Sequence, residues 1–100
     1  MLFAVIDHGG EANRVGLTMP DTKLVIFGSP TAGTPVMVAA PLAALDLPFK
    51  LLVSEDPAGS VSVSYNSPSW LAERHHLSEE MAARLEQIET ISDAVVAVDT

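Results

Sequence analysis

The alternation of hydrophobic and polar positions along the chain predicts four β-strands. Residues 2–7 and 23–28 are apolar runs of strand length, and the second is rich in β-branched and aromatic residues without polar alternation, as is typical of a central strand. Residues 49–55 and 60–66 flank Asp56-Pro57-Ala58-Gly59, which suits a type I turn followed by a left-handed glycine. These two segments are predicted to form a hairpin with one apolar face and one polar face.

Three helices are predicted at residues 35–45, 68–76 and 79–98, and residues 11–16 can form a short fourth one. Each of the three follows a hydroxyl residue suited to the N-cap, and two of them begin with proline; the caps are Thr34, Ser67 and Ser78. The segment 35–45 has almost no polar face, so we expect it to be buried against the sheet and another helix or a second subunit. Pro41 predicts a kink in it. Apolar residues at steps of three and four make 79–98 amphipathic.

These elements predict an α+β fold in two layers, with an antiparallel sheet of about four strands packed by helices. A chain of 100 residues suits one domain over residues 1–100, which buries roughly 60% of the surface of its unfolded chain. The final amphipathic helix would be its C-terminal element, over residues 78–98.

Composition narrows the function classes. The net charge is −8, so the field of the protein opposes binding to nucleic acid and to anionic membranes. No cysteine is present, which excludes disulfides, a thiol nucleophile and thiolate metal ligands, and no motif calls for a cofactor. No signal peptide is recognised, and glycines and prolines interrupt the uncharged stretch 24–45, so a cytoplasmic location is expected.

Several short motifs then occur in a recognisable order. They are IDH at 6–8, FG-x-P at 27–30, GTP-x-M at 33–37, DLP-x-K at 46–50, SYN-x-P at 64–68 and RH at 74–75. Over about residues 2–77 the chain resembles the bacterial and archaeal family called domain of unknown function 302. The resemblance implies a two-layer α+β fold of the TATA-binding-protein-like group and implies no established biochemistry.

The chain departs from that family at three points. Ser29 stands where relatives usually have asparagine, and Ser54 and Ser62 stand where aromatic residues are common. The two hairpin serines are predicted to lie nearly opposite each other across the ladder. Relatives also tend to carry a strand and a helix before residue 2, so this chain is either a shortened member or one with a truncated start. An uncovered sheet edge would follow, and we therefore expect a homodimer.

The candidate ligand-binding residues are His8, Asn66, Arg74 and His75. His8 beside Asp7 could act as a general base, or it could simply end the strand with a satisfied imidazole. Arg74 and His75 favour the C-terminal end of a helix, and Asn66 suits a turn, so each also has a structural interpretation. His75 and the following histidine point about 100° apart on a helix, which disfavours a metal pair, and no metal site is predicted.

The loop at 28–34 joins a strand to a helix start and contains two glycines, as phosphate-binding loops do. It lacks the Walker lysine, so a nucleotide is disfavoured, and a small anion at Gly33 and Thr34 is the preferred hypothesis.

Two functions follow from these positions. The leading hypothesis is a non-enzymatic domain that dimerises and binds a small molecule or a protein partner. The alternative is a small-molecule enzyme in which His8 is the acid or base and Asn66 and Arg74 orient an anionic substrate. The alternative requires the fold to bring these three residues together.

Overall fold

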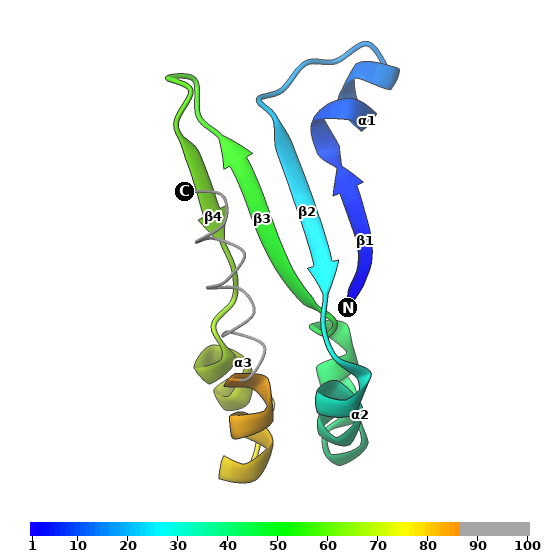
Figure 1. Ribbon diagram of the computed structural model, residues 1–100, viewed down its shortest axis with the longest axis vertical. Helices are drawn as coiled ribbons and strands as arrows, with labels where there is room; N and C mark the ends of the chain where they lie inside the picture. Colours follow the sequence, from blue (N-terminus) through cyan, green and yellow to red (C-terminus); the bar gives the residue numbers. More distant parts are fainter. Residues whose placement is uncertain (87–100) are drawn as a thin grey trace.

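The computed structural model describes residues 1–86, and within them the expected α+β fold with a four-stranded antiparallel sheet is confirmed. The strands lie side by side in chain order, each paired with the next (Figure 1). Their bounds are β1 Leu2–Asp7, β2 Thr22–Phe27, β3 Phe49–Glu55 and β4 Val61–Ser64. β2 and β3 are the inner strands, as the unbroken apolar run at 23–28 predicted, and β1 and β4 form the edges.

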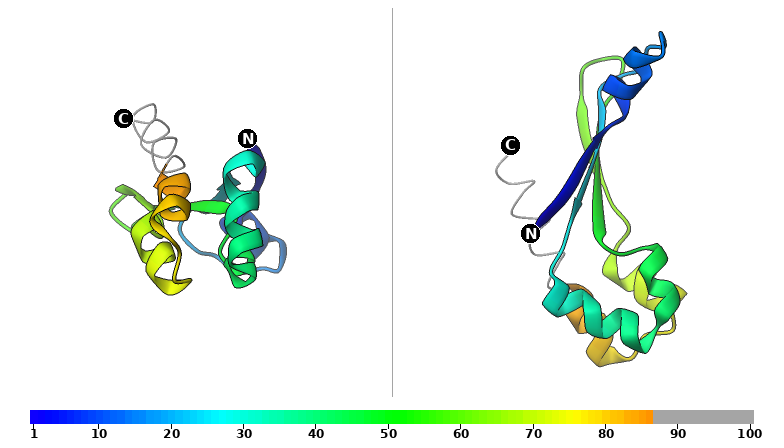
Figure 2. Two further views of the ribbon diagram at one scale, coloured as in Figure 1. Left: turned by 90° about the horizontal axis from the view of Figure 1, so that it is seen from below. Right: turned by 90° about the vertical axis from the view of Figure 1, so that its right-hand side faces the viewer.

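The helices gather at the two ends of the sheet. Figures 1 and 2 place α1 at one end and α2, η1 and α3 at the other. Their bounds are α1 His8–Arg14, α2 Pro30–Ala39, the 3₁₀ helix η1 Pro41–Leu45 and α3 Pro68–Arg74. Residues 79–86 are also helical and begin after Ser78, whose Oγ accepts the Met81 N–H at 3.3 Å, so the predicted helix 79–98 is confirmed as far as residue 86. Its remainder, 87–98, lies outside the described residues.

Helix α2 begins earlier than predicted. Its N-cap is Ser29, whose Oγ accepts the Ala32 N–H at 3.4 Å, and Pro30 is its first residue. The prediction of Thr34 as the N-cap and Pro35 as the first residue was wrong, because Ser29 and Pro30 form an equally good cap and first residue, and starting there gains another turn. Serine and asparagine both cap helices well, so the family's usual asparagine at this position would serve the same purpose.

Pro41 divides the predicted helix 35–45 into two. The Ala40 N–H still bonds to the Val36 carbonyl at 2.8 Å, but Pro41 has no N–H to continue the ladder and starts η1 instead. The expectation that this segment is buried holds for one face only. Val38, Leu42 and Leu45 are 69–77% exposed in the single chain.

Helices α1 and α3 end in the same way. After α1 the N–H groups of Gly16 and Leu17 bond to carbonyls of the last turn, and Gly16 has a φ of 78°. After α3 the N–H groups of His76 and Leu77 make the equivalent bonds, and His76 has a φ of 52°. Both are Schellman motifs, which favour glycine at the left-handed residue. At the end of α3 a histidine occupies that place.

The hairpin forms as predicted. Asp56 Oδ1 accepts the N–H groups of Ala58 and Ser60, each at 2.9 Å, and Gly59 takes the left-handed position with a φ of 86°. The register pairs Ser54 with Ser62 directly, which confirms their predicted opposition.

The hydrophobic core lies where the sheet meets α2, η1, α3 and the helix at 79–86. Phe49 is at its centre, with Phe27 edge-on and Tyr65 tilted against it, each at a ring-centroid distance of 5.8 Å. The remaining buried apolar residues of the cluster are Val36, Ala43, Leu47, Leu51, Leu71 and Leu85. The core therefore fixes α2, η1, α3 and the helix at 79–86 to one end of the sheet, and it includes no residue of α1 or β1.

Candidate functional site

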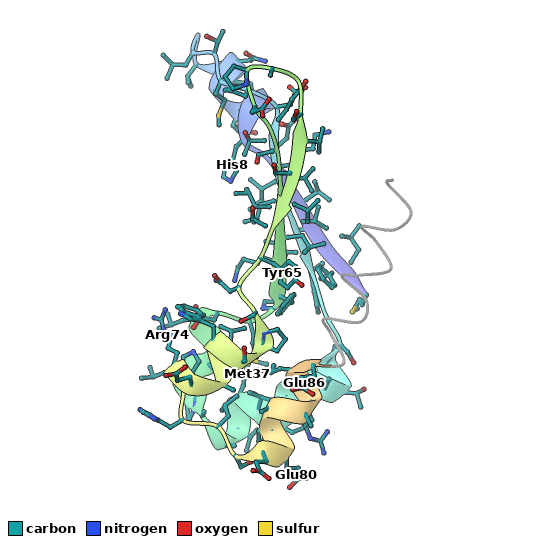
Figure 3. The ribbon with its side chains drawn as sticks, turned by 90° about the vertical axis from the view of Figure 1, so that its left-hand side faces the viewer. His8, Met37, Tyr65, Arg74, Glu80 and Glu86 are labelled. Atoms are coloured by element: carbon teal, nitrogen blue, oxygen red, sulfur yellow. The ribbon has the colours of Figure 1, made fainter. Side chains whose placement is uncertain are left out.

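The structure does not bring His8 together with the other predicted site residues. His8 is the first residue of α1, and the register places the end of β1 level with Val53 of β3. His75 instead contacts Asp46, which precedes the first residue of β3. Four residue steps of strand, at about 3.3 Å each, separate Phe49 from Val53 by roughly 13 Å along β3. Figure 3 shows His8 and Arg74 at opposite ends of the sheet.

The hypothesis of an enzyme site that joins His8, Asn66 and Arg74 therefore has no support in this geometry. Asp7 is the N-cap of α1, and its Oδ1 accepts the Gly10 N–H at 3.0 Å. The carboxylate beside His8 thus has a structural role at the start of a helix.

Asn66, Arg74 and His75 do lie in one neighbourhood, around Asp46. Two side chains contact the same carboxylate oxygen, Asp46 Oδ2: His75 Nε2 lies 2.6 Å from it and Arg74 Nε lies 3.5 Å from it. Asn66 and Asp46 line a small cavity of about 20 Å³, which has room for about one water molecule. We call Asp46, Lys50, Arg74 and His75 the Asp46 cluster.

Local structure positions each member of the cluster. Asp46 follows the last residue of η1, and the Lys50 ammonium donates to the Asp46 carbonyl at 3.1 Å and to the Pro48 carbonyl at 3.3 Å. Arg74 and His75 come at the end of α3, which Ser67 starts by accepting the Trp70 N–H at 3.2 Å. The cluster thus joins the start of β3 to the end of α3.

The chemistry available to the cluster differs between its members. His75 Nε2 lies at hydrogen-bond distance from Asp46 Oδ2, and the tautomer that carries its proton on Nε2 donates this hydrogen bond to the carboxylate. The His75 side chain is 7% exposed, which limits its access to a substrate in solution. Arg74 is 47% exposed and its guanidinium lies 5.5 Å from the centre of the Trp70 ring, a cation–π contact at the surface. The arrangement is that of a structural clamp in which the Arg74 guanidinium is accessible to solvent.

Asp46 was not singled out from the sequence as a site residue. Its only signal was its place in the DLP-x-K motif, which the sequence presents as the end of a helix. A partner 29 residues away cannot be inferred from that motif alone.

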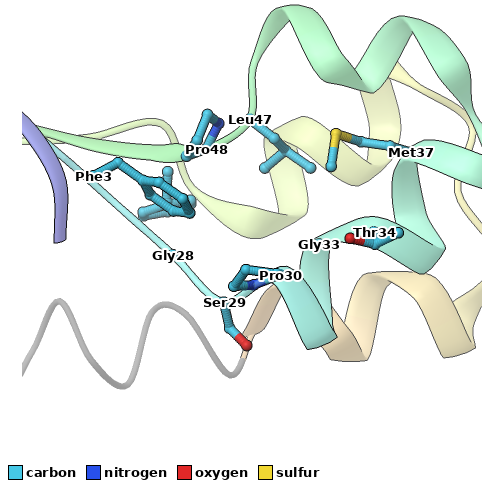
Figure 4. Close-up of a pocket in the computed structure, with 10 residues that line it drawn as sticks. Phe3, Gly28, Ser29, Pro30, Gly33, Thr34, Met37, Leu47 and Pro48 are labelled. Carbon is cyan, nitrogen blue, oxygen red and sulfur yellow. The ribbon is translucent and has the colours of Figure 1, made fainter. Parts of the chain in front are cut away.

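Gly33 and Thr34 do not start a helix, so the predicted anion site at these residues is corrected. They lie inside α2, and the Gly33 N–H is already bonded to the Ser29 carbonyl at 2.8 Å. An N–H group inside the helical ladder is not available to an anion. The same residues instead line an apolar pocket with a volume of about 240 Å³, between β1, the start of α2 and the start of β3 (Figure 4).

A second, more polar pocket of about 380 Å³ lies near His8 at the opposite end of the sheet. Its lining includes the carboxylates of Asp7, Asp21 and Glu55 together with Lys23 and Ser54. Residues 1–86 contain no group of three His, Cys, Asp or Glu side chains placed to hold a metal ion. Over the same residues, no helix is both long enough and apolar enough to cross a membrane.

Fold and site together define a small α+β domain with an antiparallel sheet, helices at its ends and a partly buried contact between Asp46 and His75. The chain belongs to the family described as Domain of unknown function DUF302, whose model matches residues 1–95. This confirms the resemblance inferred from the motifs.

The chain is also similar to part of larger proteins from Brucella. It is 45% identical over 76 residues to the protein named Fluoride-specific ion channel FluC 1 of Brucella suis biovar 1 (strain 1330), and this match covers 76% of the chain and 30% of that protein. The identity is the same with FluC 1 of Brucella abortus biovar 1 (strain 9-941), of which 28% is covered. The chain thus spans less than a third of the length of the curated relatives it matches.

Proposed function

We propose that this chain is an interaction domain that forms a homodimer through its edge strand β1. The observation that carries the proposal is the exposure of that strand. All six residues of β1 are exposed, including four large apolar side chains at 38–63%: Leu2, Phe3, Val5 and Ile6.

Such an edge is unusual for a strand that stays unpaired. Val5 and Ile6 are consecutive, so they point to opposite faces, and both faces of the strand are apolar. Edge strands carry a free row of N–H and C=O groups, and proteins protect them with charges, prolines, bulges or a covering element. β1 has a register shift between Leu2 and Ala4 and a single charged residue, Asp7, at its end. Pairing with another strand would satisfy the backbone and bury the apolar side chains at once.

The charge pattern favours a second copy in antiparallel orientation. The two Asp7 carboxylates would then lie at opposite ends of the seam, whereas a parallel pair would bring them together and repel. Antiparallel pairing of identical strands is also the two-fold arrangement that most homodimers adopt. The seam would carry uncharged side chains over the rest of its length.

The name Fluoride-specific ion channel belongs to Brucella proteins of which this chain matches less than a third. Fluoride conduction is therefore not part of the proposed function. The proposal for this domain rests on its own edge strand.

The test is the molar mass in solution of matched variants, measured by size-exclusion chromatography with light scattering at micromolar concentration. Val5→Lys puts a charge on the proposed seam, and Val61→Lys puts the same charge on an exposed valine of the other edge strand, β4. We expect a dimer for the wild type and for Val61→Lys, and a monomer for Val5→Lys. A monomeric wild type, or a Val5→Lys variant that stays dimeric, would overturn the proposal.

A further inference from the structure

We propose that the apolar pocket beside Gly33 binds a small uncharged ligand through a ring-sized apolar group. This proposal does not rest on the homodimer. It is argued from the lining of the pocket, from one glycine of α2 and from the volume.

Four parts of the chain build the pocket. They are β1 through Phe3, the loop between β2 and α2, one side of α2, and the start of β3 with the residues before it (Figure 4). The lining residues are Phe3, Gly28, Ser29, Pro30, Gly33, Thr34, Met37, Leu47, Pro48 and Phe49. The lining comes from three stretches of sequence, residue 3, residues 28–37 and residues 47–49, which meet only in the fold, so the pocket is a feature of the tertiary structure.

The lining favours a neutral ligand. None of the described residues that line it carries a charge, and Ser29 and Thr34 supply its side-chain hydroxyls. Ser29 Oγ already accepts the Ala32 N–H, and Figure 4 shows that hydroxyl turned away from Phe3 and Pro48. A charged group placed here would lose part of its hydration, and no charged side chain among the described lining residues would offset that loss.

Gly33 supports a ligand site on separate grounds. A glycine inside a helix destabilises it relative to alanine, so its presence needs a reason. Backbone conformation does not supply one, since its φ is not positive. Steric conflict does not either, because a Cβ at this position would contact the Met37 side chain, at Cε, at an ordinary distance of 3.9 Å. Because Gly33 has no side chain, the space that a side chain would fill on this wall remains part of the pocket.

The volume sets the size of the ligand. A dry apolar cavity of about 150 Å³ is known to accept benzene, so a pocket of about 240 Å³ has room for a somewhat larger ring system. Pockets for drug-sized molecules start at roughly 300 Å³. Indole is therefore a suitable probe: it is neutral, bicyclic and nearly all apolar.

The experiment is a titration of the full chain with indole, followed by the backbone amide signals in two-dimensional NMR. We expect saturable shifts centred on Gly28, Gly33 and Met37, and no comparable shifts with indole-3-acetate, which carries the same ring and a negative charge. Shifts confined to other parts of the chain, no saturable binding of indole, or equal binding of the anion would overturn the proposal.

Two substitutions on α2 form a matched pair. Gly33→Leu fills the pocket, and Ala39→Leu adds the same side chain at an exposed position of the same helix. We expect Gly33→Leu to raise the dissociation constant for indole at least about tenfold, a loss of about 1.4 kcal/mol, and Ala39→Leu to leave it within about twofold. Equal binding by the two variants would contradict the assignment.

Two further variants keep the test decisive. If Gly33→Leu does not fold, Phe3→Ala serves instead, since it removes one wall at a residue that is 44% exposed, and it should weaken binding of indole. The Val5→Lys variant separates this proposal from the homodimer. Indole binding by both the wild type and Val5→Lys supports a ligand site. If Val5→Lys binds indole and the wild type does not, a second copy covers the pocket in the wild type, and the proposal of a ligand site is overturned.

Discussion

His75 Nε2 lies 2.6 Å from Asp46 Oδ2, although the two residues are 29 positions apart in the chain. The contact closes the end of α3 onto the junction between η1 and β3. Both side chains are largely shielded from solvent, at 7% and 15% exposure. Little water is therefore available to replace either partner of the hydrogen bond, and the bond is stronger than it would be at the surface.

Removal of the Asp46 carboxylate is expected to destabilise the domain. Hydrogen bonds to charged groups contribute about 1.5–3 kcal/mol, so Asp46→Ala should lower the free energy of unfolding by about 2 kcal/mol. Urea denaturation followed by circular dichroism measures this. The control is Glu11→Ala, which breaks the exposed pair of Glu11 with Arg14 and should cost no more than about 0.5 kcal/mol. Similar losses in the two variants would show that the Asp46 cluster is no more than a surface contact.

The two Schellman motifs predict opposite effects of glycine exchange. His76 is exposed and left-handed, so His76→Gly relieves the strain of a side chain at positive φ and should stabilise the protein by about 0.5–1 kcal/mol. Gly16→Ala imposes that strain and should destabilise by about 1 kcal/mol, even though a Cβ at Gly16 meets nothing within 4 Å. Thermal unfolding compares both variants with the wild type. A destabilised His76→Gly variant would mean that the His76 side chain has a role of its own.

Two leucines test where the core ends. Leu71 is buried on α3 and Leu42 is 72% exposed on η1. Leu71→Ala should cost about 2–5 kcal/mol, because it leaves a cavity among packed side chains, whereas Leu42→Ala should change the stability by less than about 0.5 kcal/mol. Urea denaturation at low protein concentration gives both values. A large loss from Leu42→Ala would show that a second copy or another partner covers η1.

The paired serines of the hairpin allow the register of β3 and β4 to be tested by substitution. Ser54 and Ser62 face each other across β3 and β4, so β-branched residues at both positions should interact directly. Ser54→Thr combined with Ser62→Thr is expected to stabilise the protein by about 0.2–1 kcal/mol more than the sum of the single changes. A double-mutant cycle measures this coupling. Strict additivity would show that the two side chains do not meet in the folded protein.

The elements of this fold that depend on near neighbours could be predicted from the sequence. The turn at Asp56 to Gly59, the cap of α3 at Ser67 and the Ser54–Ser62 register all formed as expected. Each is decided by hydrogen bonds or side-chain alternation within a few residues, so the local pattern contains the relevant physics. The family could be inferred for the same reason, since its motifs are mostly caps, turns and strand ends.

Other features were decided by the tertiary structure alone. Two serine- or threonine-proline pairs could each have started α2, and local chemistry does not rank them. The separation of His8 from His75 and the pairing of His75 with Asp46 depend on how the strands align and which end of the sheet the core occupies. Contacts across many residues require the chain to close a loop, and no short segment of sequence records which loops close. The sequence by itself therefore determined most of the elements and the family, and the tertiary structure decided the start of α2, the Asp46 cluster and the pocket.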